Sequence, residues 1–355
     1  MFLTITNILS TAWSIIIAIT ALLIMIMVHE FGHYTAGKLL GFKINEFAIG
    51  FGPKLFKKTA KSGEVFSIRL IPIGGFCAFE GEDEENPSEM AFNNQKPWKR
   101  IIVLLAGVLF NFLTAIIVFT IFFMTYGYSV PSVKDIYEFT NEQVNVLQVD
   151  DKILAVNGKN VYSIYESNLG SLISKAGDTM TLTIIRDDVT MDIEVTKNEY
   201  SYTNDANEVV TNVGIGIQMQ FVSYQFNFFG ALWRGIVSCY QIIALILSTL
   251  GKLFTGLIGI KGTLAGPITT IAAISTTTAS YGFSGYLSVL AVISASIAFT
   301  NILPLPALDG SRVIFVIIEW IRKKPINRKV EGMIHAIGLL VLFSLTILLD
   351  ILNWV

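Results

Sequence analysis

The chain has 355 residues, of which 53% are hydrophobic and only 15% are charged, and its formal net charge is −2. This composition is typical of a membrane protein with several spans and one modest polar domain. The near-neutral charge argues against a nucleic-acid partner. Lys38 is the first basic residue, so the N-terminal segment lacks the basic start of a cleavable signal peptide.

Residues 1–38 are expected to form a first transmembrane helix that carries the motif His29-Glu30-Phe31-Gly32-His33. Ionisable side chains are costly in lipid and usually have a chemical role there. Residues four apart lie on one face of a helix, so His29 and His33 could bind one metal ion while Glu30 transfers a proton. Two structural histidines are the alternative, but they leave the adjacent glutamate unexplained.

Residues 39–100 form a long loop with a candidate β-hairpin. The segment 65–75 has the pattern of a strand, Pro72 favours a place at a sheet edge, and 76–79 could be the partner strand. An open edge can bind an extended peptide by strand addition, which makes Phe66 and Ile68 candidate substrate-binding residues. A purely structural hairpin is an equally good interpretation.

Three more transmembrane helices are expected, at 101–127, 284–321 and 333–355. Lysines and arginines crowd the loops 39–100 and 322–332. Basic residues mark cytoplasmic loops, so both of these loops are placed in the cytoplasm.

An even number of crossings must separate two cytoplasmic loops. The apolar segment 236–260 is therefore expected to lie on the outer leaflet, within a region of surface helices and loop at 221–283, although a true fifth span is the alternative. Four spans leave both termini and the polar domain at 128–220 outside. The expected fold is a polytopic α-helical membrane protein with a cytoplasmic-side, membrane-associated β element and an extracytoplasmic α/β domain.

The polar domain contains short strands rich in Val, Ile and Thr, such as 180–185 and 191–196. The segment 151–158 predicts a strand that ends in an Asn-Gly turn. This stretch resembles the core of a PDZ domain. Asp150 replaces the usual glycine and 145–149 replaces the usual small-residue loop, which puts capture of C-terminal carboxylates in doubt.

A catalytic zinc ion usually has three protein ligands, so two histidines need a partner. The candidates are His335, at the start of the last helix, and Asp309, inside an apolar span. The expected depth in the membrane favours Asp309 as the third ligand. Asp309 and His29 both lie on the order of 13–20 Å from the cytoplasmic edge that the basic residues mark. Pro304 and Pro306 would break the helix there and let the backbone line a cavity. The alternative role for Asp309 is the N-cap of a helix at 310–320.

Taken together, the motifs resemble the site-2 protease family (peptidase family M50), and within it the RseP/RasP-type bacterial proteins with one PDZ-like domain. The resemblance covers nearly the whole chain. It rests on the HExxH motif, the PDZ-like insert and the stretches 70–76, 96–111, 262–268 and 301–310.

The resemblance implies an intramembrane metalloprotease that binds Zn²⁺ through His29, His33 and Asp309, with Glu30 as the catalytic base. It implies that Asn301, Pro304, Pro306 and Asn111 contact the substrate, and that 65–79 dips into the bilayer. The expected location is the bacterial inner membrane, with the active site near the cytoplasmic side. The expected partners are the lipid bilayer and single-span membrane proteins, already trimmed by another protease.

Two other functions are compatible with parts of the sequence. Gly282-Phe-Ser284-Gly285 matches a short motif of rhomboid serine proteases, in which Ser284 would be the nucleophile and His335 the base. A zinc transporter could also carry histidines and an aspartate in its spans. A transporter, however, needs neither Glu30 nor a peptide-binding insert.

Overall fold

The computed structural model describes residues 5–82, 86–141, 145–161, 169–203, 207–259 and 263–354. The chain divides into two compact units. One unit combines Met1–Thr120 with Gly235–Val355 and holds most of the helical residues. The other, Ile121–Arg234, contains the polar domain expected at 128–220.

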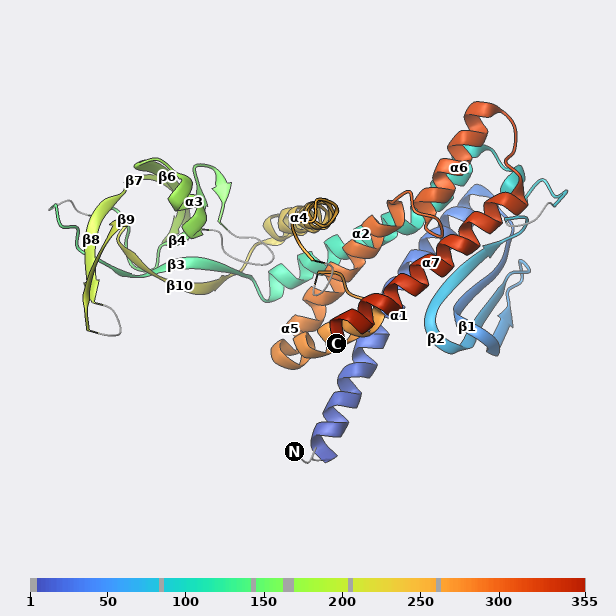
Figure 1. Ribbon diagram of the computed structural model, residues 1–355, viewed down its shortest axis with the longest axis horizontal. Coiled ribbons are helices and arrows are strands. Elements are labelled where there is room, and N and C mark those ends of the chain that lie inside the picture. The colour runs from blue at the N-terminus through green and yellow to red at the C-terminus, as the bar shows by residue number, and fades with distance from the viewer. Residues whose placement is uncertain are drawn as a thin grey trace. The chain divides into compact units, whose positions relative to one another are not determined.

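Within the described residues, five helices are long and apolar enough to cross a membrane (Figure 1). They are α1 (Ile5–Leu40), α2 (Pro97–Thr125), α4 (Phe228–Phe254), α5 (Pro267–Ile302) and α7 (Arg328–Trp354). This is one more candidate than the four spans predicted, because α4 continues as a helix through Gly251. The number of crossings and the surface position of 236–260 stay predictions.

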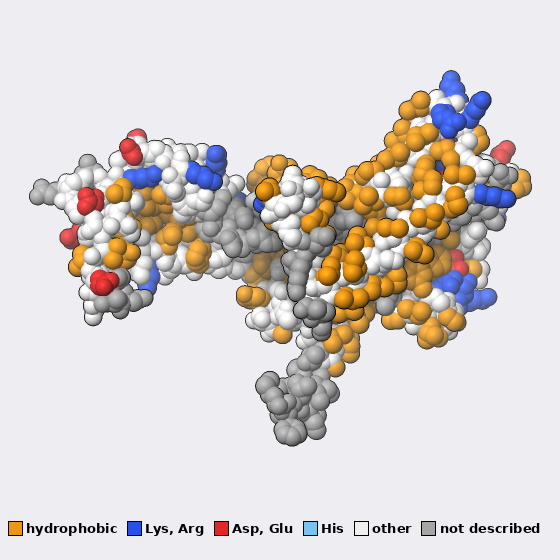
Figure 2. Space-filling view, in the orientation of Figure 1, with side chains coloured by type: hydrophobic (Ala, Val, Ile, Leu, Met, Phe, Trp, Pro, Cys, Tyr) orange, Lys and Arg blue, Asp and Glu red, His pale blue; other side chains and the backbone are white. Residues whose placement is uncertain are grey.

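The helices of the first unit approach one another closely at small residues. A Cβ added to Gly32 of α1 would lie 2.5 Å from the carbonyl oxygen of Ala106 on α2. Small residues that allow such backbone contact are typical of helices packed in lipid. Figure 2 shows hydrophobic side chains over the outward faces of these helices, as a membrane-facing surface requires. Leu340 and Phe343 of α7 are examples of exposed apolar residues.

The segment expected as one span at 284–321 is two helices. α5 has a kink at Gly282 (φ 61°, ψ −139°) and ends at Ile302, and α6 runs from Asp309 to Arg322. The connector 303–308 between them contains Pro304 and Pro306, which confirms the predicted helix break. Proline lacks the amide hydrogen that a helix interior needs. The break leaves α6 free to begin in a new position beside α1.

The β element is built differently from the predicted hairpin. Residues 65–79 form a single strand, β2 (Val65–Phe79), whose partner is β1 (Ile44–Thr59), so the proposed pairing of 65–75 with 76–79 is wrong. Glycines and a proline at 50–53 interrupt the alternation in β1 and conceal the strand in the sequence. The two strands fold back on themselves, because Ile49 pairs with both Gly75 and Ile68.

The Glu46 side chain connects neighbouring strand segments of this folded-back sheet. Its carboxylate accepts hydrogen bonds from Ser67 Oγ (2.6 Å), Arg69 Nη2 (2.8 Å) and Lys54 Nζ (2.9 Å). Burial alone would raise the pKa of Glu46, but the bonds from Ser67, Lys54 and Arg69 lower it to about 2. The carboxylate therefore stays charged and holds three parts of the two strands together at neutral pH.

The second unit contains a mainly antiparallel sheet around an apolar core. Its strand order is β10-β3-β4-β6-β7, with β5 beside β4, and β8 pairs separately with β9. The predicted Asn-Gly turn is confirmed: Asn157 (φ 48°) and Gly158 (φ 72°) join β4 to β5. The bounds are β3 (Tyr128–Ile136), β4 (Lys152–Val156), β5 (Lys159–Asn160), α3 (Leu169–Lys175), β6 (Thr179–Arg186), β7 (Val189–Thr196), β8 (Asn198–Thr203), β9 (Val209–Gly214) and β10 (Ile217–Tyr224).

Candidate metal centre

Three potential metal ligands from distant parts of the chain meet beside α1. His29 and His33 are buried on one face of this helix, and Asp309 is the first residue of α6. Asp309 Oδ2 lies 2.9 Å from His29 Nε2 and 3.3 Å from His33 Nε2, and the two imidazole nitrogens are 3.2 Å apart. The structure thus brings together the three residues that the sequence proposed as ligands.

The start of α6 sets the position of Asp309. Leu308 occupies the N-cap and Asp309 follows it inside the first turn, so the N-cap alternative for Asp309 is wrong. The partial positive charge of a helix N-terminus favours a carboxylate at this place. A Cβ added to Gly310 would lie 2.3 Å from the Ile302 carbonyl oxygen, so only glycine lets α6 begin directly against the end of α5.

A backbone carbonyl of α2 sets the orientation of His33. His33 Nδ1 lies 2.8 Å from the carbonyl oxygen of Val103, which can only accept a hydrogen bond. Nδ1 therefore carries the hydrogen, and the lone pair of Nε2 points toward His29 and Asp309. Metal-binding histidines are commonly oriented by such a bond from the second ring nitrogen.

Gly107 of α2 lies directly against both imidazoles. A Cβ at this residue would come within 2.6 Å of His33 Nε2 and 2.8 Å of His29 Cε1. Side chains cannot approach so closely without displacement, so glycine is required for α2 to cover the site. In the sequence, Gly107 is only one residue of the stretch 96–111, and no role was predicted for it.

The spacing of the three ligand atoms fits a tetrahedral zinc ion. Metal–ligand bonds of 2.0–2.1 Å imply ligand atoms roughly 3.3 Å apart, close to the 2.9–3.3 Å observed. A half-buried carboxylate that faces two imidazole nitrogens also favours a cation nearby, because a charge without a partner is costly inside a protein. In the part of the chain that the structure describes, only these three residues form such a group.

Glu30 lies next to this group and to the β element. A Cβ added to Gly75 of β2 would lie 3.7 Å from Glu30 Cγ, so the backbone of β2 passes beside the Glu30 side chain. Glu30 is therefore placed where a carboxylate could exchange a proton close to the metal ligands and beside an extended strand.

The predicted substrate residues of the helices lie in different settings. The Asn111 side chain is fully buried in α2, and neither its amide nitrogen nor its amide oxygen has a partner among the described residues. Asn301 donates to the Ile297 carbonyl oxygen in its own helix. Pro304 and Pro306 both lie in the connector that leads to Asp309.

Phe66 and Ile68 do not lie at an open sheet edge, contrary to the prediction. Phe66 pairs with Phe47 on one side and Lys58 on the other, and Ile68 pairs with Ile49 and Phe56. The folding back of β1 onto β2 places this part of β2 inside the sheet. The segment 75–79 of β2 pairs with β1 on one side only, and its first residue, Gly75, lies beside Glu30.

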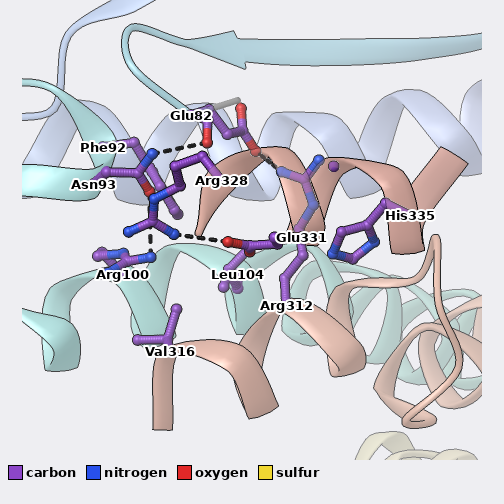
Figure 3. Close-up of a pocket in the computed structure, with 11 residues that line it drawn as sticks. Glu82, Phe92, Asn93, Arg100, Leu104, Arg312, Val316, Arg328, Glu331 and His335 are labelled. Carbon is purple, nitrogen blue, oxygen red and sulfur yellow. Dashed lines mark hydrogen bonds and ion pairs between the residues drawn. The ribbon is translucent and has the colours of Figure 1, made fainter. Parts of the chain in front are cut away.

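A cluster of charged residues holds α6 against its neighbours, and Figure 3 shows four of them, Glu82, Arg100, Arg312 and Arg328. Arg100 of α2 donates to Glu319 of α6 at 2.6 Å, and Arg328 of α7 contacts the same carboxylate at 2.7 Å. Arg312 of α6 pairs with Glu82, which follows β2. In the sequence, Arg100 and Arg328 indicate only that their loops are cytoplasmic, and their ion pairs with Glu319 were not predicted. Loss of one partner from a buried ion pair is strongly destabilising.

Comparisons with known proteins agree with this geometry. The model of peptidase family M50 matches residues 17–345. A Clostridium perfringens protein is 30% identical over 95% of this chain and 97% of its own, and a Vibrio cholerae protein is 29% identical over 94% and 96%. A Clostridium acetobutylicum protein is 29% identical over 96% of both chains, and all three are named "putative zinc metalloprotease". The chain therefore belongs to peptidase family M50, the site-2 protease family, and is a zinc metalloprotease.

Proposed function

We propose that this metalloprotease hydrolyses peptide bonds within the membrane-spanning segments of other membrane proteins. The observation that carries the proposal is the position of the ligand group. His29 and His33 belong to an apolar helix of spanning length, and Asp309 follows a break between two apolar helices. The expected substrates are single-span proteins already trimmed by another protease, such as anti-sigma factors or signal-peptide remnants. Family membership decides against the serine-protease and transporter alternatives.

His29, His33 and Asp309 would hold the zinc ion through Nε2, Nε2 and a carboxylate oxygen. Zinc supplies Lewis acidity, which activates a water molecule and polarises the scissile carbonyl. The Glu30 carboxylate accepts the proton released by this water and then donates it to the leaving nitrogen. The Asn301 amide has a second N–H besides the one bound to Ile297, and this group is the proposed donor to the oxyanion.

The segment 75–79 is the proposed site at which the substrate is held extended. A peptide bond in a helix is shielded by the helix's own hydrogen bonds, so the substrate must unwind before attack. An edge strand can pair with the unwound backbone by strand addition.

We expect Cys77→Pro to impair cleavage of a helical substrate more than cleavage of a short unfolded peptide. Proline removes the backbone N–H at position 77 of this edge segment. An indirect effect of the substitution on Glu30 would slow cleavage of both substrates equally. A change in the ratio of the two kcat/KM values therefore measures only the contribution of strand pairing at this edge. Equal losses on the helical and the unfolded substrate would contradict strand addition.

The proposed orientation follows the basic residues. Lysines and arginines at 39–100 and 322–332 place these loops in the cytoplasm of a bacterial inner membrane, with the metal site near that side. Residues 128–220, as a PDZ-like domain, and the outer-surface region at 221–283 would then lie outside. There they would act as a size filter that excludes untrimmed substrates.

Reconstitution in liposomes tests the function. We expect the full chain to cleave a trimmed single-span protein inside its apolar segment, and an untrimmed form at least tenfold more slowly. A zinc chelator should stop cleavage and added Zn²⁺ should restore it, because a metal bound only by the folded state can be removed and returned. Mass spectrometry of the products locates the bond. Cleavage confined to a soluble segment would overturn intramembrane proteolysis, and equal rates for the two forms would overturn the filter.

A further inference from the structure

The connector 303–308 that delivers Asp309 to the metal centre is in an unfavourable backbone conformation. Ala307 has a φ of 77°, in the left-handed region that residues with a Cβ rarely adopt. Such a conformation is unfavourable for alanine and persists only where surrounding contacts impose it. Asp309 lies two residues further along the chain. The contacts that hold Ala307 therefore influence where the Asp309 carboxylate is placed.

One such contact comes from His335 of α7. The backbone amide of Ala307 donates a hydrogen bond of 3.1 Å to His335 Nδ1. The His335 ring also meets the Phe315 ring of α6 edge-on, with centroids 5.6 Å apart. One imidazole thus contacts both the connector and the helix that begins with Asp309. Figure 3 shows His335 beside α6 residue Arg312 at one end of the charged cluster.

A second contact lies one turn further along α7. A Cβ added to Gly338 would lie 2.3 Å from Pro306 Cβ and 2.8 Å from the Pro306 carbonyl carbon. The backbone of α7 at Gly338 therefore packs directly against Pro306, with no side chain of α7 between them. Gly338 packs against Pro306, and His335 Nδ1 accepts the hydrogen bond of Ala307. The last helix therefore contacts two adjacent residues of the connector.

We propose that His335 is a positioning residue: together with Gly338 it holds the connector in the shape that presents Asp309 to His29 and His33. His335 itself does not bind the metal ion. The inference rests on the assignment of Asp309 as a ligand in the proposed function. The last helix is thereby part of the metal site, although it contributes none of the ligands.

The test compares His335→Leu with His335→Asn in the purified full-length chain. Asparagine can place Oδ1 near the position of imidazole Nδ1 and keep the bond to Ala307, whereas leucine fills similar space without an acceptor. Zinc affinity is measured by competition with a chromogenic chelator. We expect His335→Leu to weaken zinc binding about 10- to 100-fold, which is the usual effect of losing a residue that orients a metal ligand. The zinc affinity of His335→Asn should stay within about threefold of the wild type.

Gly338→Ala and Gly332→Ala form a matched pair on the same helix. The first places a Cβ against Pro306, and the second has open space around it. We expect at least a tenfold loss of zinc affinity for Gly338→Ala and none for Gly332→Ala. Thermal unfolding of the zinc-free protein is measured for every variant. A lower midpoint with unchanged zinc affinity would show a merely structural role and overturn the proposal, as would equal affinities for His335→Leu and His335→Asn.

Asp309→Ala separates this inference from the function on which it rests. If Asp309→Ala leaves zinc affinity unchanged, the ligand assignment itself is wrong. If Asp309→Ala abolishes tight binding while His335→Leu and Gly338→Ala have no effect, only the positioning role is wrong. Neither result depends on the choice of protein substrate, because the readout is zinc binding.

Discussion

Glu30→Gln should abolish peptide hydrolysis while zinc remains bound at wild-type affinity. Glutamine has the shape of glutamate but cannot accept the proton of the attacking water, and general acid–base groups contribute about 10²–10⁴ in rate. His29, His33 and Asp309 keep their contacts with one another in this variant, because none of those contacts involves Glu30. Cleavage of a reconstituted substrate and zinc content of the same preparation are the two measurements.

The control is Glu89→Gln, which removes a carboxylate from an exposed loop. It should cleave at the wild-type rate, so an effect of Glu30→Gln cannot be ascribed to the lost negative charge in general. Cleavage by Glu30→Gln at a wild-type rate would refute the assigned role of the carboxylate. Loss of zinc together with activity would instead identify Glu30 as a residue that supports the metal centre.

Gly107→Ala should cost zinc affinity as well as activity, although it adds a single methyl group. The new Cβ would lie 2.6 Å from His33 Nε2 and 2.8 Å from His29 Cε1, and both contacts require movement of the ligands or of α2. Alanine is the better helix former by about 1 kcal/mol, so any loss must come from this contact and not from helix propensity. We expect zinc affinity to fall by at least about 100-fold, since two ligands are displaced at once.

Gly251→Ala is the matched control for that substitution. Gly251 also lies inside a long helix, and a Cβ there meets no other atom within 4 Å. It should leave zinc affinity and cleavage unchanged. Wild-type zinc affinity in Gly107→Ala would show that the helices can separate without disturbing the ligands, and would remove the packing explanation for this glycine.

The sequence alone was sufficient for features that depend on local pattern. Long apolar runs predicted helices of spanning length, and an Asn-Gly pair predicted a turn that the structure confirms at 157–158. The spacing of His29 and His33 placed both imidazoles on one helix face. Similar depth in the membrane selected Asp309 over His335 as their partner, and in the structure Asp309 is the residue that meets them.

The tertiary structure was needed wherever contacts join distant segments. The partner of β2 was missed because glycines and a proline interrupt β1, and Phe66 was wrongly assigned to an edge because β1 folds back over it. The sequence pattern could not predict the roles of Gly107 and His335. The role of Gly107 depends on the imidazoles that pack against it, and the role of His335 depends on the backbone amide that donates a hydrogen bond to its ring. The sequence by itself therefore predicted the three potential metal ligands that the structure brings together. Only the packing of α2, α6 and α7 decided how they are held in place, because close approach and hydrogen bonding between segments depend on three-dimensional distance.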